Sequence, residues 1–559
     1  MLNEQQKKAV FELSSNTLVT ASPGSGKTRT LVARATHKVK SLPKFKTIAL
    51  ITYTNAGAEE IASRLDIDKN IFIGTIHCFC LEYILRPFGW IFKWRRPLVI
   101  NYEQQQNFFI ENPDIDLGYK KFDELGKIQK DLNGELDKTV EWEHSVSLED
   151  VAKRYYEYQE KLGVIDFNEI LYRSYKIVIN NLFVANSLAS KFFEILVDEF
   201  QDTNLFQYEI LKAINNHGDC TFFMVGDEKQ RIFSFAGAIE NAFTKAKKDF
   251  NADVQVLTKT YRSSNKIVNT YSKLFSQHPK IENRSKYKNF QKSVYFIKTT
   301  KQNHSEKLKK IVDILIQKYK IKEHEIAILS TSWYSAFKAS KILRQDYNIV
   351  GLGALPHKTV SSSSMSLLRA LAKYKYDPNI RRLRNIKRHI DIHLLEKGLV
   401  FSEKLLNKKT NNLIKEILNI PPDEILVNGI NYIQEIFNCV FETNHTSFDE
   451  VKELLDNNEK NDWTIDKYLK IFSGIDGITS NTIHKAKGLE FKAVILHEMN
   501  ENKIPYQKRI CEHTHTYAPL SSEDIINGKN LFYVALSRAE KFLITLHNWK
   551  PSMFIDLVK

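Results

Sequence analysis

The stretch from Ala21 to Thr28, which reads Ala-Ser-Pro-Gly-Ser-Gly-Lys-Thr, constrains the fold of this chain more than any other. It follows an apolar, β-prone run, Thr17 to Thr20, and precedes a segment with helical spacing, Thr30 to Val39. The glycines therefore fall at a strand-to-helix turn, which is where a phosphate-binding loop belongs. A plain glycine-rich turn is the alternative, and the strand before Gly-Lys-Thr disfavours it.

The residues of this loop suit the binding of a nucleoside triphosphate with Mg²⁺. Gly24 and Gly26 allow backbone N–H groups to close around phosphates, Lys27 supplies a positive charge, and the Thr28 hydroxyl is suited to a Mg²⁺ shell. Ala21 departs from the general pattern, G-x-x-x-x-G-K-[ST], which has glycine at that position. The residues predicted to bind ATP here are Ala21, Ser22, Pro23, Gly24, Ser25, Gly26, Lys27, Thr28 and Arg29.

Asp198 and Glu199 end a second apolar run, Phe192 to Val197, and are the expected partners of the loop from a neighbouring strand. Asp198 is predicted to hold Mg²⁺ together with Thr28, and Glu199 to orient and deprotonate the attacking water. Acidic pairs often do no more than end a strand. Because a phosphate loop is present in the same chain, we favour the catalytic interpretation.

Short apolar strands alternate with helical stretches in two parts of the chain, a pattern typical of parallel sheets covered by helices. Two other parts lack this rhythm and are mostly helix-prone. We therefore expect an α/β fold of two domains, each interrupted by a helical insertion. The predicted segments are 1–85 and 165–250 for the first α/β domain, 86–164 for its insertion, 251–349 and 471–559 for the second, and 350–470 for its insertion.

The charge balance favours a polyanionic partner. The net charge of +15 is spread over many short Lys/Arg clusters, which favours nucleic acid over a small neutral ligand, although a solvated basic surface is the alternative. The five cysteines form no C-x-x-C pair, as expected in a reducing cytosol. With no apolar signal core and no run of ~18 apolar residues, we expect a cytoplasmic protein without a membrane partner.

Further motifs follow in the order typical of one family. Asp198-Glu199-Phe200-Gln201-Asp202 resembles the D-E-x-Q-D signature of the UvrD/Rep family of superfamily 1 DNA helicases. The segments 226–230, 261–263, 482–491 and 532–539 resemble its later motifs, among them Y-R-S and H-x-A-K-G-L-E-F. An ordered set of this kind does not arise readily by chance. The resemblance implies two RecA-like parallel-sheet P-loop domains and an ATP-dependent DNA helicase.

The same resemblance extends the ATP site beyond the loop. It implies that Gln6 contacts adenine, that Gln230 senses the γ-phosphate and that Glu490 contacts the ribose. Arg262 and Arg538 are implied to reach the site from the second domain, where they stabilise the charge of phosphoryl transfer. The alternative for either arginine is a surface ion pair. The predicted catalytic residues are Lys27, Asp198, Glu199, Gln230, Arg262 and Arg538, and the family commonly has alanine at the position of Ala21.

Single-stranded DNA requires phosphate contacts and aromatic faces on which bases stack. The resemblance places these faces at Tyr53, Phe233 and Phe235, although each ring would equally well fill a core. Two departures from the family pattern weaken the prediction of DNA binding. Phe235-Ala236-Gly237-Ala238 lacks the arginine of W-R-G-A, and 527–529 lacks the usual acidic residues. The other predicted DNA-binding residues are Thr54, Asn55, Thr75, His77 and His484.

A basic stripe stands apart from these motifs. Arg381, Arg384 and Arg388 lie at i, i+3 and i+7 and share one face of a predicted helix. Such a stripe either contacts duplex phosphates or is a solvated face.

Three functions remain open from the sequence. The favoured one is an ATP-driven translocase on single-stranded DNA and single/double-strand junctions, with 3′ to 5′ helicase activity implied by the resemblance. The alternative is a DNA-sensing ATPase subunit that regulates a nuclease partner, similar to the helicase-like subunit of Gabija-type antiphage systems, because the motif arginine is missing and the chain is short. A small-substrate kinase shares the phosphate loop but does not account for the motifs of a second domain.

Overall fold

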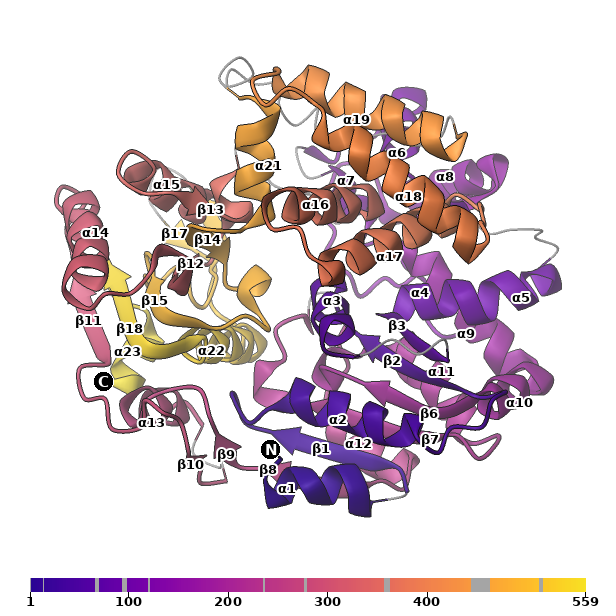
Figure 1. The fold of residues 1–559 in the computed structure, drawn as a ribbon, viewed down its shortest axis with the longest axis horizontal. Helices are drawn as coiled ribbons and strands as arrows, with labels where there is room; N and C mark the ends of the chain where they lie inside the picture. Colours follow the sequence, from indigo (N-terminus) through magenta and orange to yellow (C-terminus); the bar gives the residue numbers. More distant parts are fainter. Residues whose placement is uncertain are drawn as a thin grey trace.

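The computed structural model describes residues 2–13, 15–65, 70–92, 98–118, 121–234, 237–275, 279–355, 362–443, 463–511 and 516–559. It contains two six-stranded parallel sheets, each covered by helices, and two helical insertions (Figure 1). The prediction of an α/β fold with two parallel-sheet domains is confirmed. No helix in these ranges is both long and apolar enough to cross a membrane.

The first sheet has the strand order β3-β2-β6-β7-β1-β8. Its central strands are buried along nearly their whole length, as expected for parallel strands with helices on both faces. The strands are β1 (Thr17–Ala21), β2 (Thr47–Thr52), β3 (Ile71–Thr75), β6 (Phe192–Val197), β7 (Thr221–Gly226) and β8 (Asp253–Leu257). The helices that precede, join or follow them are α1 (Glu4–Lys7), α2 (Lys27–Val39), α3 (Asn55–Arg64), α4 (Ile76–Cys80), α5 (Arg86–Phe88), α9 (Phe167–Asn180), α10 (Leu182–Lys191), α11 (Leu205–Asn215) and α12 (Ala242–Asp249).

The second sheet has the order β11-β18-β15-β12-β14-β13. Its strands are β11 (Val294–Lys298), β12 (Ile326–Ser330), β13 (Ile349–Val350), β14 (Ile478–Thr482), β15 (Phe491–Leu496) and β18 (Ala539–His547). Its helices are α13 (Asn265–Ser272), α14 (His304–Asp313), α15 (Trp333–Leu343), α22 (Ser522–Leu536) and α23 (Met553–Val558). Two short ribbons accompany it, β9 (Lys259–Thr260) with β10 (Glu282–Asn283), and β16 (Arg509–Cys511) with β17 (Thr516–Tyr517).

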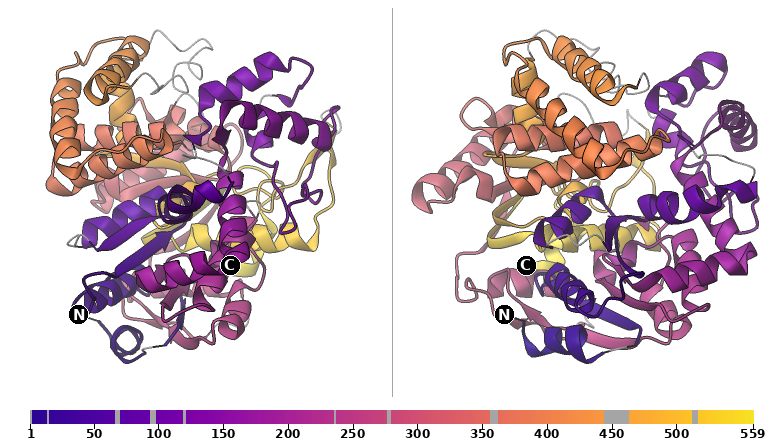
Figure 2. Two further views of the ribbon diagram at one scale, coloured as in Figure 1. Left: turned by 90° about the vertical axis from the view of Figure 1, so that its right-hand side faces the viewer. Right: turned by 45° about the vertical axis from the view of Figure 1, so that its right-hand side comes forward.

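The two insertions lie on the same side of the sheets (Figures 1 and 2). The first consists of α6 (Tyr102–Glu111), α7 (Lys121–Leu125), α8 (Leu148–Leu162) and the short strand pair β4 (Leu98–Val99) and β5 (Val164–Ile165). The second consists of α16 (Ser363–Tyr376), α17 (Ile380–Glu396), α18 (Glu403–Leu418), α19 (Leu426–Phe441) and α21 (Ile465–Ser473). Each has its own apolar core.

Two expectations about the first sheet are wrong. The chain does not leave this sheet at residue 250, because β8 pairs in parallel with β1. Most side chains of β8 are solvent-exposed, so this edge strand lacks the apolar run that identifies a strand in sequence. In addition, β6, which ends next to Asp198, is not the neighbour of the loop-bearing β1, because β7 lies between them.

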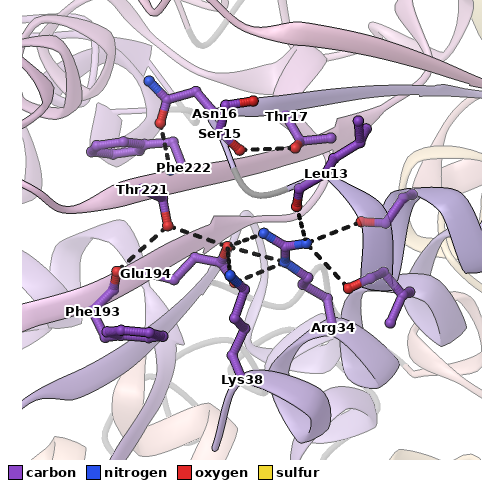
Figure 3. A network of polar contacts seen from close by, with 12 residues as sticks. Leu13, Ser15, Asn16, Thr17, Arg34, Lys38, Phe193, Glu194, Thr221 and Phe222 are labelled. Carbon is purple, nitrogen blue, oxygen red and sulfur yellow. Dashed lines mark hydrogen bonds and ion pairs between the residues drawn. The ribbon is translucent and has the colours of Figure 1, made fainter. Parts of the chain in front are cut away.

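A buried ion pair ties the N-terminal segment to this sheet (Figure 3). Arg34 of α2 donates to Glu194 of β6 at 2.6 Å, and both side chains are almost fully buried. The Arg34 Nη1 donates to the carbonyl oxygens of Ala9, Val10 and Leu13. Arg34 therefore joins three parts of the chain: the helix after the phosphate loop, the strand before Asp198 and the segment after Gln6.

Candidate functional site

The predicted phosphate loop lies between β1 and α2. Gly24 and Gly26 adopt positive φ angles of 71° and 83°. A β-carbon at Gly24 would lie 2.6 Å from the Cβ of Arg262 and 2.7 Å from the Oγ1 of Thr260. Glycine at this position therefore allows the loop to pack directly against the segment that leads into the second domain.

The ammonium group of Lys27 occupies an unusual position. Its Nζ lies 3.5 Å from the Oε2 of Glu199 and is buried, with no hydrogen-bond partner among the described residues. A buried ammonium that makes no hydrogen bond is costly for the folded protein. Its position fits the addition of a phosphate oxygen, and the oxygen ligands of Thr28 and Asp198 fit the preference of Mg²⁺ for hard donors.

The two carboxylates after β6 differ in ionisation. Burial and the neighbouring Glu199 raise the pKa of Asp198. Burial also acts to raise the pKa of Glu199, but Lys27 and Lys487 outweigh it and lower that pKa. The side-chain amide of Gln201 donates to Glu199 at 2.6 Å and fixes its orientation. Glu199 therefore ionises more readily than Asp198, and the ionised state is the one required of a base.

Residues from the second α/β domain complete this region. The Nη2 of Arg538 donates to the Oε1 of Gln230 at 3.2 Å, and the Gln230 amide donates to Asp227 at 2.8 Å. Arg538 is buried, and this burial, followed by the charge of Arg262, lowers its pKa to about 9. The Nε of Arg262 donates to Glu490 at 2.8 Å.

The N-terminal segment closes the other side of the loop. The Gln6 amide donates to the carbonyl oxygen of Ser25 at 2.9 Å, and its Oε1 accepts from the backbone N–H of Asn3 at 3.0 Å. The Asn3 amide in turn donates to the hydroxyl of Tyr261 at 2.8 Å. Gln6 is therefore held against the phosphate loop and linked to the segment that carries Arg262.

Most residues predicted for the ATP site line one cavity of about 1230 Å³. Ala21, Ser22, Ser25 and Asp198 are buried and do not line it. The predicted residues that line it are Gln6, Pro23, Gly24, Gly26, Lys27, Thr28, Arg29, Glu199, Gln230, Arg262, Glu490 and Arg538.

The predicted stacking residues form a second group near this cavity. The ring of Tyr53 stacks on that of Phe233, with centroids 4.5 Å apart, and His484 lies 6.1 Å from Phe233. His77 instead packs edge-on against Phe167, and burial lowers the pKa of His77 to about 4, so it is neutral. Phe235 lies outside the described residues.

The remaining predicted DNA contacts lie at helix N-termini. Thr54 caps α3 and Thr75 caps α4, each accepting a backbone N–H through its side chain. The amide of Asn55 donates to Ser366 of the second insertion at 3.4 Å. A phosphate group is well placed at such a terminus, because backbone N–H groups there lack intrahelical partners.

Two family models match this chain. The one described as UvrD/REP helicase N-terminal domain matches residues 2–251, and the one described as UvrD-like helicase C-terminal domain matches residues 381–548. The chain belongs to the UvrD/Rep family of helicases. Among its relatives, the ATP-dependent DNA helicase Rep of Buchnera aphidicola subsp. Acyrthosiphon pisum is 24% identical, with 99% of this chain and 96% of the relative aligned. The ATP-dependent DNA helicase PcrA of Staphylococcus aureus is also 24% identical, with 99% of this chain and 84% of the relative aligned.

This UvrD-like chain is therefore an ATP-dependent DNA helicase, and the kinase interpretation no longer applies. Its geometry adds one residue that the sequence analysis does not nominate. Lys487 of the second domain forms an ion pair with the buried Asp202 and donates to the carbonyl oxygen of Gln230 at 2.7 Å. Asp202 and Lys487 both lie within the family motifs, and their opposite charges were the signal available in the sequence.

The predicted basic stripe lies on α17, and only part of it is exposed. Arg381 and Arg384 are exposed, but the Nη nitrogens of Arg388 are buried. Helical spacing identifies which residues share a face and does not reveal that a neighbouring helix covers one end of it.

Proposed function

We propose that this UvrD-like helicase moves along single-stranded DNA in the 3′ to 5′ direction and hydrolyses ATP between its two α/β domains. The observation that supports hydrolysis between the two domains is the hydrogen bond from Arg538 to Gln230, whereas the proposed direction rests on the resemblance to the UvrD/Rep family. This hydrogen bond joins an arginine after α22 in the second domain to a glutamine after β7 in the first, at the cavity that holds the phosphate loop. In the proposed division of the chain, the first domain comprises 1–85 and 165 to about 257, and the second domain begins directly after it. The bounds of the two insertions stay at 86–164 and 350–470.

In this proposal, Lys27 neutralises the β- and γ-phosphates and Glu199 accepts a proton from the attacking water. Thr28 and Asp198 hold Mg²⁺, which when bound neutralises charge on the phosphate oxygens. Gln201 keeps Glu199 in place through the 2.6 Å hydrogen bond. Gln6 contacts the base and Glu490 contacts the ribose. Phosphoryl transfer is therefore carried out by the residues around Lys27.

The two arginines make hydrolysis depend on domain closure. Arg262 and Arg538 belong to the second domain, so they add positive charge to the phosphoryl-transfer site only while the two domains are together. Hydrolysis and phosphate release remove the anion that holds these cations in place. Opening of the cleft then changes the distance between the DNA contacts of the two domains, which produces a step along the strand.

The strand path runs past the aromatic pair. Tyr53 follows β2 of the first domain, whereas Phe233 contacts His484 of the second, so the stacked rings lie at the junction that opens and closes. In the proposed cycle, DNA bases stack on these rings in place of the stacking between the rings themselves. The N-termini of α3 and α4 contact the strand phosphates.

Strand displacement tests the direction of movement. We expect duplexes with a 3′ single-stranded tail to open with ATP and Mg²⁺, while 5′-tailed and blunt duplexes of the same sequence remain closed. The Lys27→Ala variant serves as the matched control and should open neither. Opening of the 5′-tailed duplex in preference to the 3′-tailed one would contradict the proposed polarity.

A further inference from the structure

One carboxylate of the first domain, Glu59, makes two polar contacts with the second insertion. α17 lies directly over α3 (Figure 1). Glu59 of α3 accepts a hydrogen bond from the Nζ of Lys373 on α16 at 2.7 Å and contacts the Nε2 of His389 on α17 at 2.7 Å. Burial acts to raise the pKa of Glu59, but Lys373 and His389 outweigh it and lower that pKa, so the carboxylate is ionised.

Two arginines beside this carboxylate have too few partners. Both Nη nitrogens of Arg388 and the Nε of Arg369 are buried, with no hydrogen-bond partner in the described part of the chain. Burial lowers the pKa of each guanidinium, and Glu59 is the carboxylate that acts against this effect in both. Arg369, Lys373 and Arg388 thus place three cations around one anion.

This imbalance is costly unless another anion is present. A buried charge without a partner destabilises a folded protein, and a guanidinium with free N–H groups loses its hydrogen bonds to water as well. Arginine is also the side chain best suited to bind two oxygens of a phosphate at once. The unpartnered nitrogens of Arg369 and Arg388 are therefore suited to bind a phosphate group, and Glu59 holds Lys373 beside them.

The site opens into the large cavity. Arg369, Lys373 and Arg388 line the same cavity of about 1230 Å³ as Lys27 and Arg262. Ligand pockets are typically about 300–1,000 Å³, so this cavity is larger than a typical pocket for one ligand. Its size is consistent with a second anion beside the nucleotide.

We propose that Arg369 and Arg388 form a second anion site, between α3 and the helices α16 and α17, which takes a phosphate group. The phosphate comes either from a free oligophosphate, such as a second nucleotide, or from the backbone of the bound DNA strand. Both arginines belong to the second insertion, and a ligand here compensates their charge beside the docking contact at Glu59. The proposal does not depend on the direction of movement or on which residues hydrolyse ATP.

Thermal unfolding tests the free-oligophosphate source. The titration uses inorganic triphosphate and the full-length Lys27→Ala variant, so that binding at the phosphate loop is already weakened. We expect triphosphate to raise the unfolding midpoint, and addition of Arg388→Met or Arg369→Met to weaken this binding about tenfold or more. Lys387→Met, which removes a neighbouring charge on α17 outside the cavity, is the matched control and should change it less than twofold.

The same variants without ligand give a second readout. Because the Nη nitrogens of Arg388 are buried and have no hydrogen-bond partner in the described ranges, Arg388→Met should leave the unfolding midpoint unchanged or raise it. A merely structural arginine would lower the midpoint on substitution, and that result would overturn the proposal.

Salt dependence of strand binding tests the DNA source. For an oligothymidylate, the slope of log K against log salt changes by about 0.7 for each DNA phosphate that the protein no longer neutralises. If the strand supplies the phosphate, Arg388→Met should reduce the slope by about this amount and Lys387→Met should not. A change in triphosphate binding alone assigns the site to a free oligophosphate, and a change in the slope alone assigns it to DNA. If Arg388→Met and Arg369→Met alter neither measurement, the proposal is wrong.

Discussion

The Nη2 of Arg538 donates to the Oε1 of Gln230 over 3.2 Å, and this hydrogen bond joins the two α/β domains at the ATP site. We expect Arg538→Lys to lower kcat for DNA-stimulated ATP hydrolysis by about 10³-fold, because an arginine that completes such a site contributes 10³–10⁵ in rate. Steady-state ATPase measurements at saturating single-stranded DNA check this. Arg154→Lys, in an exposed ion pair of the first insertion, is the control. An Arg538→Lys variant that keeps more than about a tenth of the wild-type kcat would count against a catalytic role.

Alanine substitutions at Gly24 and Gly118 distinguish a steric effect on ATP hydrolysis from a backbone effect. Gly24→Ala places a β-carbon 2.6 Å from the Cβ of Arg262, whereas Gly118 has a similar φ of 67° with nothing within 4 Å of its β-carbon position. Both substitutions incur the left-handed backbone penalty of about 1–2 kcal/mol. We expect only Gly24→Ala to lower kcat/KM for ATP, by at least about tenfold. Equal effects of the two substitutions on kcat/KM would show that close packing at Gly24 is unimportant.

Breaking the buried Arg34–Glu194 ion pair should cause a large loss of stability. Glu194→Ala leaves a buried guanidinium without its carboxylate, and breaking a buried pair costs about 3–5 kcal/mol. Urea unfolding should show this loss, and the double variant Arg34→Met with Glu194→Leu should recover much of it. The exposed pair Arg64–Glu60 is the control, with an expected loss of under about 1 kcal/mol. Identical losses at the buried and exposed pairs would refute the assigned role.

Asp202 predicts a pH dependence of stability. Burial raises the pKa of its carboxyl from 3.8 to about 6, although Lys487 acts to lower it. Between these two values the folded protein binds more protons than the unfolded one, so the contribution of Asp202 to the free energy of unfolding falls as pH rises. We expect Asp202→Asn to remove a slope of up to about 1.4 kcal/mol per pH unit in this window. Urea unfolding between about pH 4 and pH 6 measures it, and parallel curves for variant and wild type would contradict the assignment.

Local sequence signals predict those features that depend on a few consecutive residues. The phosphate loop is recognisable because a strand, two glycines with a lysine, and a helix must follow one another to bind phosphate. Asp198 and Glu199 are recognisable because they end an apolar run. For the same reason, the two α/β domains could be expected from the alternation of strands and helices.

Features that arise from packing between distant segments could not be predicted in this way. Nothing in the local pattern around β8 indicates that this exposed edge strand returns to β1. The burial of Arg388 depends on α3, more than three hundred residues earlier in the chain. Lys487 and Asp202 are also far apart in sequence, and their ion pair forms only when the two domains meet. The order of the motifs indicates the family, but it does not indicate which distant residues contact one another.

ATP hydrolysis by the wild type and by Lys27→Ala, each with and without single-stranded DNA, tests the placement of the ATP site most directly. The ammonium group of Lys27 is buried and has no hydrogen-bond partner among the described residues, and we infer that it binds a phosphate oxygen of ATP. We expect DNA to stimulate the wild-type rate and Lys27→Ala to lower the rate at least about a hundredfold in both conditions. A Lys27→Ala variant with near wild-type, DNA-stimulated hydrolysis would contradict the placement of the ATP site.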